Sequence, residues 1–196
     1  EGQRVVGFVG TFHWWHAVQG LLTPFATLHA EDPDLRLMLV GDGETRDKLK
    51  HMVQSRGLQA VVTFTGKIAH EDVPQHLAAM DVAVVPYVPL DDFFFSPMKL
   101  FEALGCGRPT VATAQGQITE VIEHGKTGWL YPPGDVEKLA AGIKTLLTDR
   151  SLAESIGHAG RRRVLDAYTW EQVTGRVIEI AVKLIERRST ARVRGT

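Results

Sequence analysis

The sequence predicts an α/β protein with a Rossmann-like, doubly wound parallel sheet of about six strands and helices on both faces. Two observations carry this prediction. Short, continuously apolar runs such as residues 35–40 and 82–87 are typical of strands that are buried on both faces of a sheet. Between such runs lie segments in which apolar side chains recur at helical spacing, as in residues 17–30. Strands and helices that alternate in this way form parallel sheets with right-handed crossovers.

The elements follow one another as strand, then helix. Expected strands cover residues 4–10, 35–40, 61–65, 82–87, 110–113 and 129–131. Expected helices cover residues 17–30, 45–56, 73–80, a short segment from 97, 118–123, 136–147, 152–157, 159–167 and 170–187. Gly57 and Gly125 end two of these helices, because glycine accepts the left-handed conformation common at helix ends. Thr169 is the expected N-cap of the last one.

Length and composition favour one ordinary globular domain. The chain has 196 residues, enough for a sizeable core, and its 44% hydrophobic content is typical of such domains. We expect a domain over residues 1–168, a C-terminal helix over 169–187 and a frayed tail over 188–196. The net charge of −1 gives no electrostatic case for a nucleic-acid partner. No apolar run approaches the roughly 20 residues that span a bilayer, and no signal peptide is apparent.

Residues 94–113 are the most informative segment. They read as a loop, a short helix, a Gly-Arg-Pro break and a buried strand, with Pro97 suited to the first turn of the helix. Lys99 and Glu102 are three residues apart and therefore share a helix face. A helix start with free N–H groups, a lysine in its first turn and a carboxylate one turn later can hold a phosphate and a sugar hydroxyl.

The position of this segment matches the expected ligand side of the fold. In doubly wound sheets, ligands bind beyond the carboxyl ends of the strands, where the strand order reverses. The loops that matter are therefore residues 10–16, 41–44, 66–70, 87–97 and 114–117. The alternation of elements thus predicts a ligand site on the loops that carry the polar and glycine-rich motifs.

Several segments in sequence order resemble the group 1 (family 4) glycosyltransferases. They are residues 8–17, 40–43, 62–67, 81–86, 94–113 and 120–130, and the likeness covers roughly residues 4–175. Residues 96–102 follow the subgroup pattern Ser-Pro-x-Lys-x-x-Glu, with Gly-x-Pro after it. A single motif of this kind is weak evidence for a family, but the occurrence of all of them in the expected order is specific.

The resemblance implies that this chain is the second, donor-binding half of a GT-B glycosyltransferase. The whole enzyme would transfer a sugar from a UDP- or GDP-sugar to an acceptor hydroxyl, with retention at the anomeric carbon and without a required metal or cofactor. Such enzymes serve polysaccharide or glycoconjugate biosynthesis.

The partner would then be the N-terminal acceptor-binding domain of the same full-length chain, onto which the helix at 169–187 would pack. The sequence starts at Glu1 without a methionine, so we expect a piece of a longer protein that is inactive by itself. The location implied is cytoplasmic, with peripheral contact with the inner face of the membrane left open.

The resemblance also assigns site residues. Glu102 would bind the ribose, because a carboxylate can accept from two adjacent hydroxyls. Lys99 would stabilise the leaving diphosphate, and His16 is a second candidate for this catalytic role. The other substrate-binding candidates lie on the same loops: Ser96, Pro97, Met98, Gly10, Thr11, Lys67, Ile68, Gly41, Gly43, Phe95 and Gln117.

Three positions depart from the family pattern. Thr11 and His16 stand where an arginine and a lysine are usual, and Phe94 stands where many members have a glutamate for the transferred sugar. Asp91 or Asp92 could supply that carboxylate, or both are solvated loop charges. The departures keep open a degenerate, non-catalytic nucleotide-binding or assembly module. A nucleotide-sugar epimerase or a glycogen-synthase-like enzyme of the same architecture also remains an alternative.

Two patterns look like metal sites and are rejected. Asp32-Pro33-Asp34 matches an Asp-x-Asp signature, but it precedes a strand and so lies at the opposite end of the sheet from the ligand loops. His13 and His16 are too few for a zinc site, which usually needs three or four protein ligands.

Overall fold

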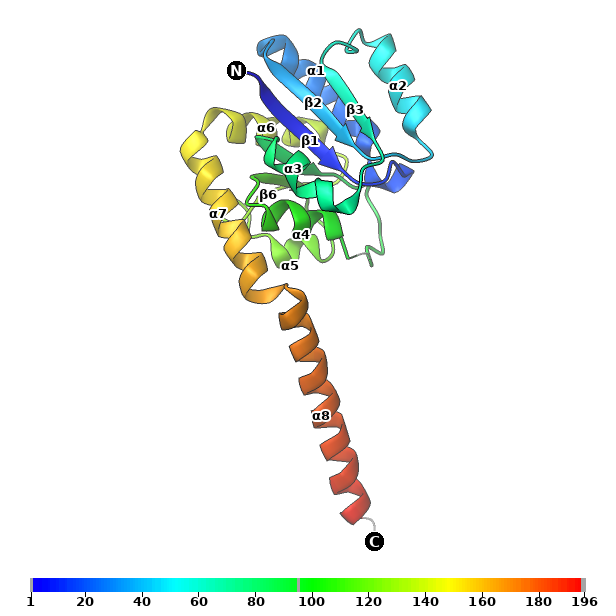
Figure 1. The fold of residues 1–196 in the computed structure, drawn as a ribbon, viewed down its shortest axis with the longest axis vertical. Helices are drawn as coiled ribbons and strands as arrows, with labels where there is room; N and C mark the ends of the chain where they lie inside the picture. The colour runs from blue at the N-terminus through cyan, green and yellow to red at the C-terminus, as the bar shows by residue number, and fades with distance from the viewer. Residues whose placement is uncertain (1, 95, 195–196) are drawn as a thin grey trace.

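The computed structural model describes residues 2–94 and 96–194, with side chains described as far as Glu186 (Figure 1). The described residues form one six-stranded parallel sheet in the order β3-β2-β1-β4-β5-β6. Its strands are β1 (Arg4–Val9), β2 (Leu35–Val40), β3 (Val62–Gly66), β4 (Val82–Val85), β5 (Thr110–Thr113) and β6 (Trp129–Tyr131). The chain winds outward from β1 to β3 and then returns to place β4 beside β1. The strand order therefore reverses between β1 and β4, as the predicted fold class requires.

Helices cover both faces of this sheet. They are α1 (Leu22–Glu31), α2 (Arg46–Ser55), α3 (Val73–Ala78), α4 (Met98–Gly105), α5 (Ile118–Val121), α6 (Val136–Thr148), α7 (Arg150–Ala167) and α8 (Trp170–Arg194), with short 3-10 turns η1 (Trp14–His16), η2 (Val18–Leu21) and η3 (His70–Asp72). Buried side chains of α1, α2 and α6 form one apolar cluster with the sheet. Those of α3, α4 and α5 form two clusters with other sheet residues. This division into two helical layers confirms the predicted doubly wound architecture.

The expected break between residues 157 and 159 is wrong, because α7 is continuous from Arg150 to Ala167. The glycines of this helix serve close packing instead. A β-carbon on Gly157 would lie 2.4 Å from the carbonyl oxygen of Gly107, and one on Gly160 would lie 2.7 Å from that of Thr127. Glycine at these positions therefore lets the backbone of two loops approach the helix.

The last helix is longer than expected and projects from the body. The predicted end at residue 187 is too early, since α8 continues to Arg194. In Figure 1, α8 extends from the end of α7 as a single rod away from the sheet. Apolar side chains along it are exposed, from Trp170 (73% exposed) through Ile178 to Ile185. In the described part of the chain, no helix combines the length and apolar character needed to cross a membrane.

Candidate functional site

The loops that follow β1 to β5 meet at one edge of the sheet, which we call the carboxyl edge (residues 10–17, 41–45, 66–70, 86–97 and 114–117). Backbone hydrogen bonds join neighbouring loops across this edge. The Phe12 N–H donates to the Asp42 carbonyl (2.9 Å), and the Gly41 N–H donates to the Gly66 carbonyl (3.1 Å). The Val88 N–H donates to Trp15 (3.0 Å). The loops predicted to carry the site are therefore brought together.

Gly41 and Gly43 let the second of these loops pack against the first. Gly41 has a φ of +126°, and a β-carbon there would lie 2.0 Å from the Gly10 carbonyl oxygen. A β-carbon on Gly43 would lie 2.7 Å from the Phe12 nitrogen. The close approach that both glycines permit is thus to the neighbouring loop, which in turn fixes the position of Gly10.

The short helix α4 places Lys99 at this edge. Pro97 is buried and precedes the helix as its N-cap residue, so the expectation that it lies in the first turn is off by one position. Ser96 and Met98 are exposed beside it. The Lys99 side chain runs against the first loop, where a β-carbon on Gly10 would lie 2.8 Å from Lys99 Cε. The fold thereby joins two predicted site residues that are distant in sequence.

The Lys99 ammonium lies in an aromatic setting. Its Nζ is 3.0 Å from the Tyr87 hydroxyl oxygen and 5.5 Å from the centre of the Phe8 ring. Burial lowers the pKa of Lys99 to about 7, and the charge of Glu102 opposes part of that fall. Our reading of the sequence missed Tyr87, and the available signal was a hydroxyl at the end of an apolar strand that leads into the site loop.

His16 is buried and neutral. Its Nδ1 lies 2.5 Å from the Thr11 carbonyl oxygen, and because a carbonyl only accepts, Nδ1 carries the hydrogen and Nε2 is left as an acceptor. Burial, and then the charge of Lys99, lower the pKa of His16 to about 4, although the bond to Thr11 opposes the fall. His16 therefore cannot supply the positive charge of the lysine that family members usually have there.

Glu102 lies one turn after Lys99 on α4 and is partly accessible, with 28% of its side chain exposed. Its Oε1 is 3.9 Å from His70 Nδ1, at the end of the loop after β3. On the same loop Ile68 packs against the apolar cluster that includes Ala103, while Lys67 is exposed. The candidates for ribose and base binding are thus neighbours. Phe95, another candidate, lies outside the described residues.

The loop after β4 is held in place by a buried glutamine. Gln115 Nε2 donates to the Val88 carbonyl (3.0 Å), and its Oε1 accepts from the Leu90 N–H (3.4 Å). Gln117 is half-buried at the start of α5. Beyond this clamp an open pocket of about 520 Å³ is lined by residues 90–94, Gln115 and Gly116. Asp91 and Asp92 are exposed at this pocket, where they remain candidates for the missing carboxylate.

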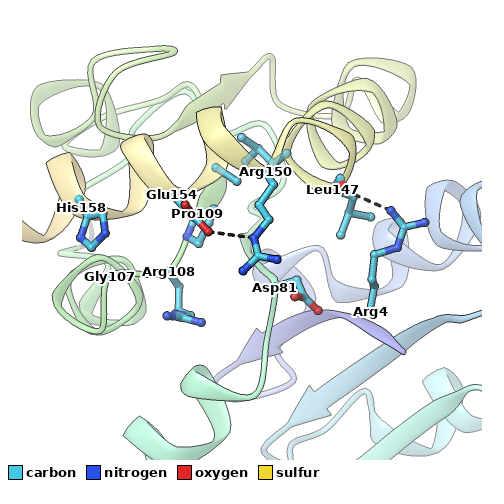
Figure 2. A pocket seen from close by; sticks show the side chains of 11 residues that line it. Arg4, Asp81, Gly107, Arg108, Pro109, Leu147, Arg150, Glu154 and His158 are labelled. Atoms are coloured by element: carbon cyan, nitrogen blue, oxygen red, sulfur yellow. Dashed lines mark hydrogen bonds and ion pairs between the residues drawn. The ribbon is translucent and has the colours of Figure 1, made fainter. Parts of the chain in front are cut away.

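A second cavity, of about 510 Å³, lies at the opposite edge of the sheet (Figure 2). The three arginines that line it each have a partner within the fold. Arg150 pairs with Glu154 (2.9 Å), Arg4 donates to the Leu147 carbonyl (3.2 Å), and Arg108 donates to the Met80 carbonyl (3.2 Å). Arg4 thus links β1 to α6, Arg108 links the turn before β5 to Met80 before β4, and Arg150 pairs within α7. Because these arginines already have partners within the fold, the carboxyl edge remains the candidate site.

The Asp-x-Asp pattern also lies away from the carboxyl edge. Asp32 pairs with Arg4, at the amino ends of β2 and β1. Its Oδ1 accepts from the Asp34 N–H (3.2 Å), which closes the turn before β2. The pattern therefore has a structural role at a turn.

The fold and the carboxyl edge define a doubly wound α/β domain whose ligand side holds a lysine and, one helical turn later, a carboxylate. Residues 3–149 match the family model for glycosyl transferases group 1, and the chain belongs to this family. The resemblance of its motifs to that family is thereby confirmed, and so is the GT-B type of its fold.

Individual relatives agree with this assignment. The chain is 34% identical over 148 residues to the sulfoquinovosyl transferase SQD2 of Arabidopsis thaliana, covering 74% of this chain and 27% of that protein. It is 32% identical over 164 residues to a GDP-mannose-dependent phosphatidylinositol monomannoside mannosyltransferase of Mycolicibacterium smegmatis, covering 82% and 43%. The crystal structure of Anabaena HepE with UDP and glucose has a TM-score of 0.82 at 26% identity, covering 92% and 48%. The chain spans less than half the length of each of these proteins.

Proposed function

We propose that this chain is the donor-binding half of a retaining glycosyltransferase that moves a sugar from a nucleoside diphosphate sugar to an acceptor hydroxyl. One observation carries the proposal: Lys99 and Glu102 lie one turn apart on α4, at the carboxyl edge, with Lys99 against the Gly10 loop. Similar proteins support it, since one was crystallised with UDP and another is named as GDP-mannose-dependent.

The donor nucleotide would lie along this edge. Glu102 would accept hydrogen bonds from the two ribose hydroxyls, and the loop with Lys67 and Ile68 beside it would hold the base. The diphosphate would lie beside Lys99 where that side chain packs against the first loop. The backbone N–H of Thr11 could also donate to it, whereas the Gly10 N–H already donates to the Val40 carbonyl (3.0 Å). The N-terminus of α4 adds a favourable dipole for an anion, although its Met98 and Leu100 N–H groups already donate to the carbonyls of Ser96 (2.9 Å) and Pro97 (2.8 Å).

Catalysis at this half would be electrostatic. As the glycosidic bond breaks, negative charge grows on the leaving diphosphate, and a preorganised ammonium at Lys99 stabilises that charge without metal. His16 would serve differently from the lysine it replaces. With Nε2 as an acceptor, it can bind a hydroxyl of the donor, or it can bind the diphosphate once it has taken up a proton.

The acceptor site would lie in an N-terminal domain of the full-length protein, together with any contact with the inner face of the membrane in the cytoplasm. The exposed apolar face of α8 supports a missing partner domain, because a helix with this much uncovered apolar surface is unusual on an isolated domain. The chain by itself would bind nucleotide and transfer no sugar.

A degenerate, non-catalytic module is the second candidate. Two observations favour it: His16 is neutral where a cation is usual, and Phe94 replaces the usual glutamate. The two functions differ in turnover of the full-length protein. Both predict nucleotide binding by this half, but the enzyme alone would release UDP or GDP from a sugar donor when an acceptor is present.

Calorimetric titration of the chain with UDP, GDP and ADP tests the proposal. We expect one base to be preferred, and Lys99→Met and Glu102→Ala each to weaken binding at least about tenfold, as loss of a charged hydrogen bond should. Lys144→Met and Glu154→Ala are matched controls, because both side chains lie in ion pairs away from the carboxyl edge. Equal effects of the site and control substitutions would refute the site.

A further inference from the structure

Tyr87 is buried between two parts of the candidate site. It follows β4 and is 3% exposed. Its ring meets the Phe93 ring edge to face at 5.0 Å and the His16 ring at 5.3 Å between centres. It also belongs to the apolar cluster that contains Leu100 of α4. The ring is thus fixed by packing on several sides, and the position of its hydroxyl is fixed with it.

The hydroxyl of Tyr87 meets the Lys99 ammonium. The Lys99 Nζ donates to the Tyr87 oxygen at 3.0 Å and lies 4.6 Å from the ring centre. On its other sides the lysine has the Phe8 ring and the backbone of Gly10. The titratable groups of the described chain that act on this ammonium are Tyr87, His16 and Glu102.

We propose that Tyr87 is a positioning residue, whose hydroxyl holds the Lys99 ammonium against the Gly10 loop at the place where a diphosphate would bind. The inference rests on the proposed function, since it takes Lys99 as the diphosphate ligand. Tyr87 would touch Lys99 and not the nucleotide.

A buried phenol suits this task better than a carboxylate. Burial raises the pKa of Tyr87 well above its usual value, so the group stays neutral and leaves the charge of Lys99 available to an anion. A hydrogen bond from an ammonium is stronger than one from a neutral amine, so the hydroxyl favours the charged lysine. This preference opposes the burial that lowers the pKa of Lys99 to about 7. Without the hydroxyl, Lys99 would lose its proton at a lower pH.

Tyr87→Phe removes the hydroxyl and keeps the ring, and Tyr131→Phe is the matched control. Tyr131 is also a buried tyrosine, at the end of β6. The first readout is the pKa of Lys99. It is measured by an NMR titration of the chain with 13C-labelled lysine, in which the Lys99→Met variant identifies the Lys99 signal. We expect Tyr87→Phe to lower this pKa by about one unit, since a hydrogen bond to a charged group stabilises that form by roughly one pKa unit or more. Tyr131→Phe should leave it unchanged.

The second readout is UDP affinity between pH 6 and 9. At pH 8 the Tyr87→Phe variant should bind UDP about tenfold more weakly than the unsubstituted chain, because a smaller fraction of its Lys99 is charged. The difference in UDP affinity should be smaller at pH 6. In a Lys99→Met background, Tyr87→Phe should not weaken UDP binding further, because Tyr87 acts through Lys99.

Three results would bear against these ideas in distinguishable ways. An unchanged Lys99 pKa in Tyr87→Phe would overturn the proposal for Tyr87. So would a shifted pKa with wild-type UDP affinity at every pH, if Lys99→Met weakens UDP binding as expected. Failure of the unsubstituted chain to bind UDP, GDP or ADP would count against the proposed function, while the Lys99 titration would still decide whether Tyr87 holds the ammonium.

Discussion

Gly41 and Gly10 meet backbone to backbone: a β-carbon on Gly41 would lie 2.0 Å from the Gly10 carbonyl oxygen. Gly10 in turn leaves the space that the Lys99 side chain occupies, since its own β-carbon would lie 2.8 Å from Lys99 Cε. The position of Lys99, the candidate diphosphate-binding residue, therefore depends on Gly41 in another loop. Gly41 need not touch the nucleotide itself.

Gly41→Ala should destabilise the fold and weaken nucleotide binding. The substitution adds a clash with backbone and also strains a residue with φ of +126°, which together should cost about 1–3 kcal/mol or more of unfolding free energy. Urea denaturation measures the cost. Gly20→Ala is the control, because nothing lies within 4 Å of its added β-carbon. If both variants were equally stable, the close approach of the two loops would be wrong.

The affinity for a nucleoside diphosphate should fall as the pH rises above 7. Burial lowers the pKa of Lys99 to about 7, and only the charged form attracts the diphosphate. Affinity should therefore be constant below this pKa and fall by up to about tenfold for each pH unit above it. UDP titrations from pH 6 to 9 test this dependence. The Lys99→Met variant should bind UDP weakly, and its affinity should not decrease with rising pH. A similar decrease in that variant would assign the pH dependence to another group.

Acid should destabilise the fold through His16. Its pKa lies at about 4 in the folded state against 6.5 for an ordinary histidine, so the unfolded chain takes up the proton first as the pH falls. Stability should decrease between pH 6.5 and 4, by up to about 3 kcal/mol from this group. Urea denaturation across this range should show a smaller decrease in His16→Asn. His51→Asn, on the exposed side of α2, should behave like the unsubstituted chain, and a smaller decrease there would contradict the assignment.

Replacing a glycine of α7 by alanine should destabilise the fold, whereas the same replacement in α8 should not. Gly157→Ala should destabilise the fold by about 1–3 kcal/mol, because its β-carbon would lie 2.4 Å from the Gly107 carbonyl oxygen. Gly175→Ala has open space and sits in a helix, so it should be neutral or stabilising by up to about 1 kcal/mol. Thermal melts compare the two variants, and a stabilising Gly157→Ala would contradict the packing of α7.

The strands were predictable from local sequence, because buried parallel strands are continuous apolar runs. Residues 35–40, 110–113 and 129–131 have the predicted bounds. The helix boundaries were less predictable from local sequence. Gly157 reads locally as a helix break, yet its role is set by Gly107, a residue that only the folded chain brings near.

For the candidate site, the placement of Lys99 and Glu102 on one short helix was predictable, and the electrostatics were not. Lys99 and Glu102 follow from helical spacing within one short segment. The link between Tyr87 and Lys99 needs the turn between β4 and α4, and a tyrosine after an apolar strand reads as core. The neutral state of His16 also depends on burial, which arises from tertiary packing and leaves no local pattern.

The central claim is that Glu102 binds the ribose of a donor nucleotide, and a cycle of two ligands and two proteins tests it most directly. UDP and 2′,3′-dideoxy-UDP are titrated into the chain and into Glu102→Ala, with the GDP pair in parallel. We expect loss of the ribose hydroxyls to weaken binding to the unsubstituted chain by about tenfold or more and to have little further effect on Glu102→Ala. Equal loss in both proteins, or unchanged UDP affinity in Glu102→Ala, would contradict the account.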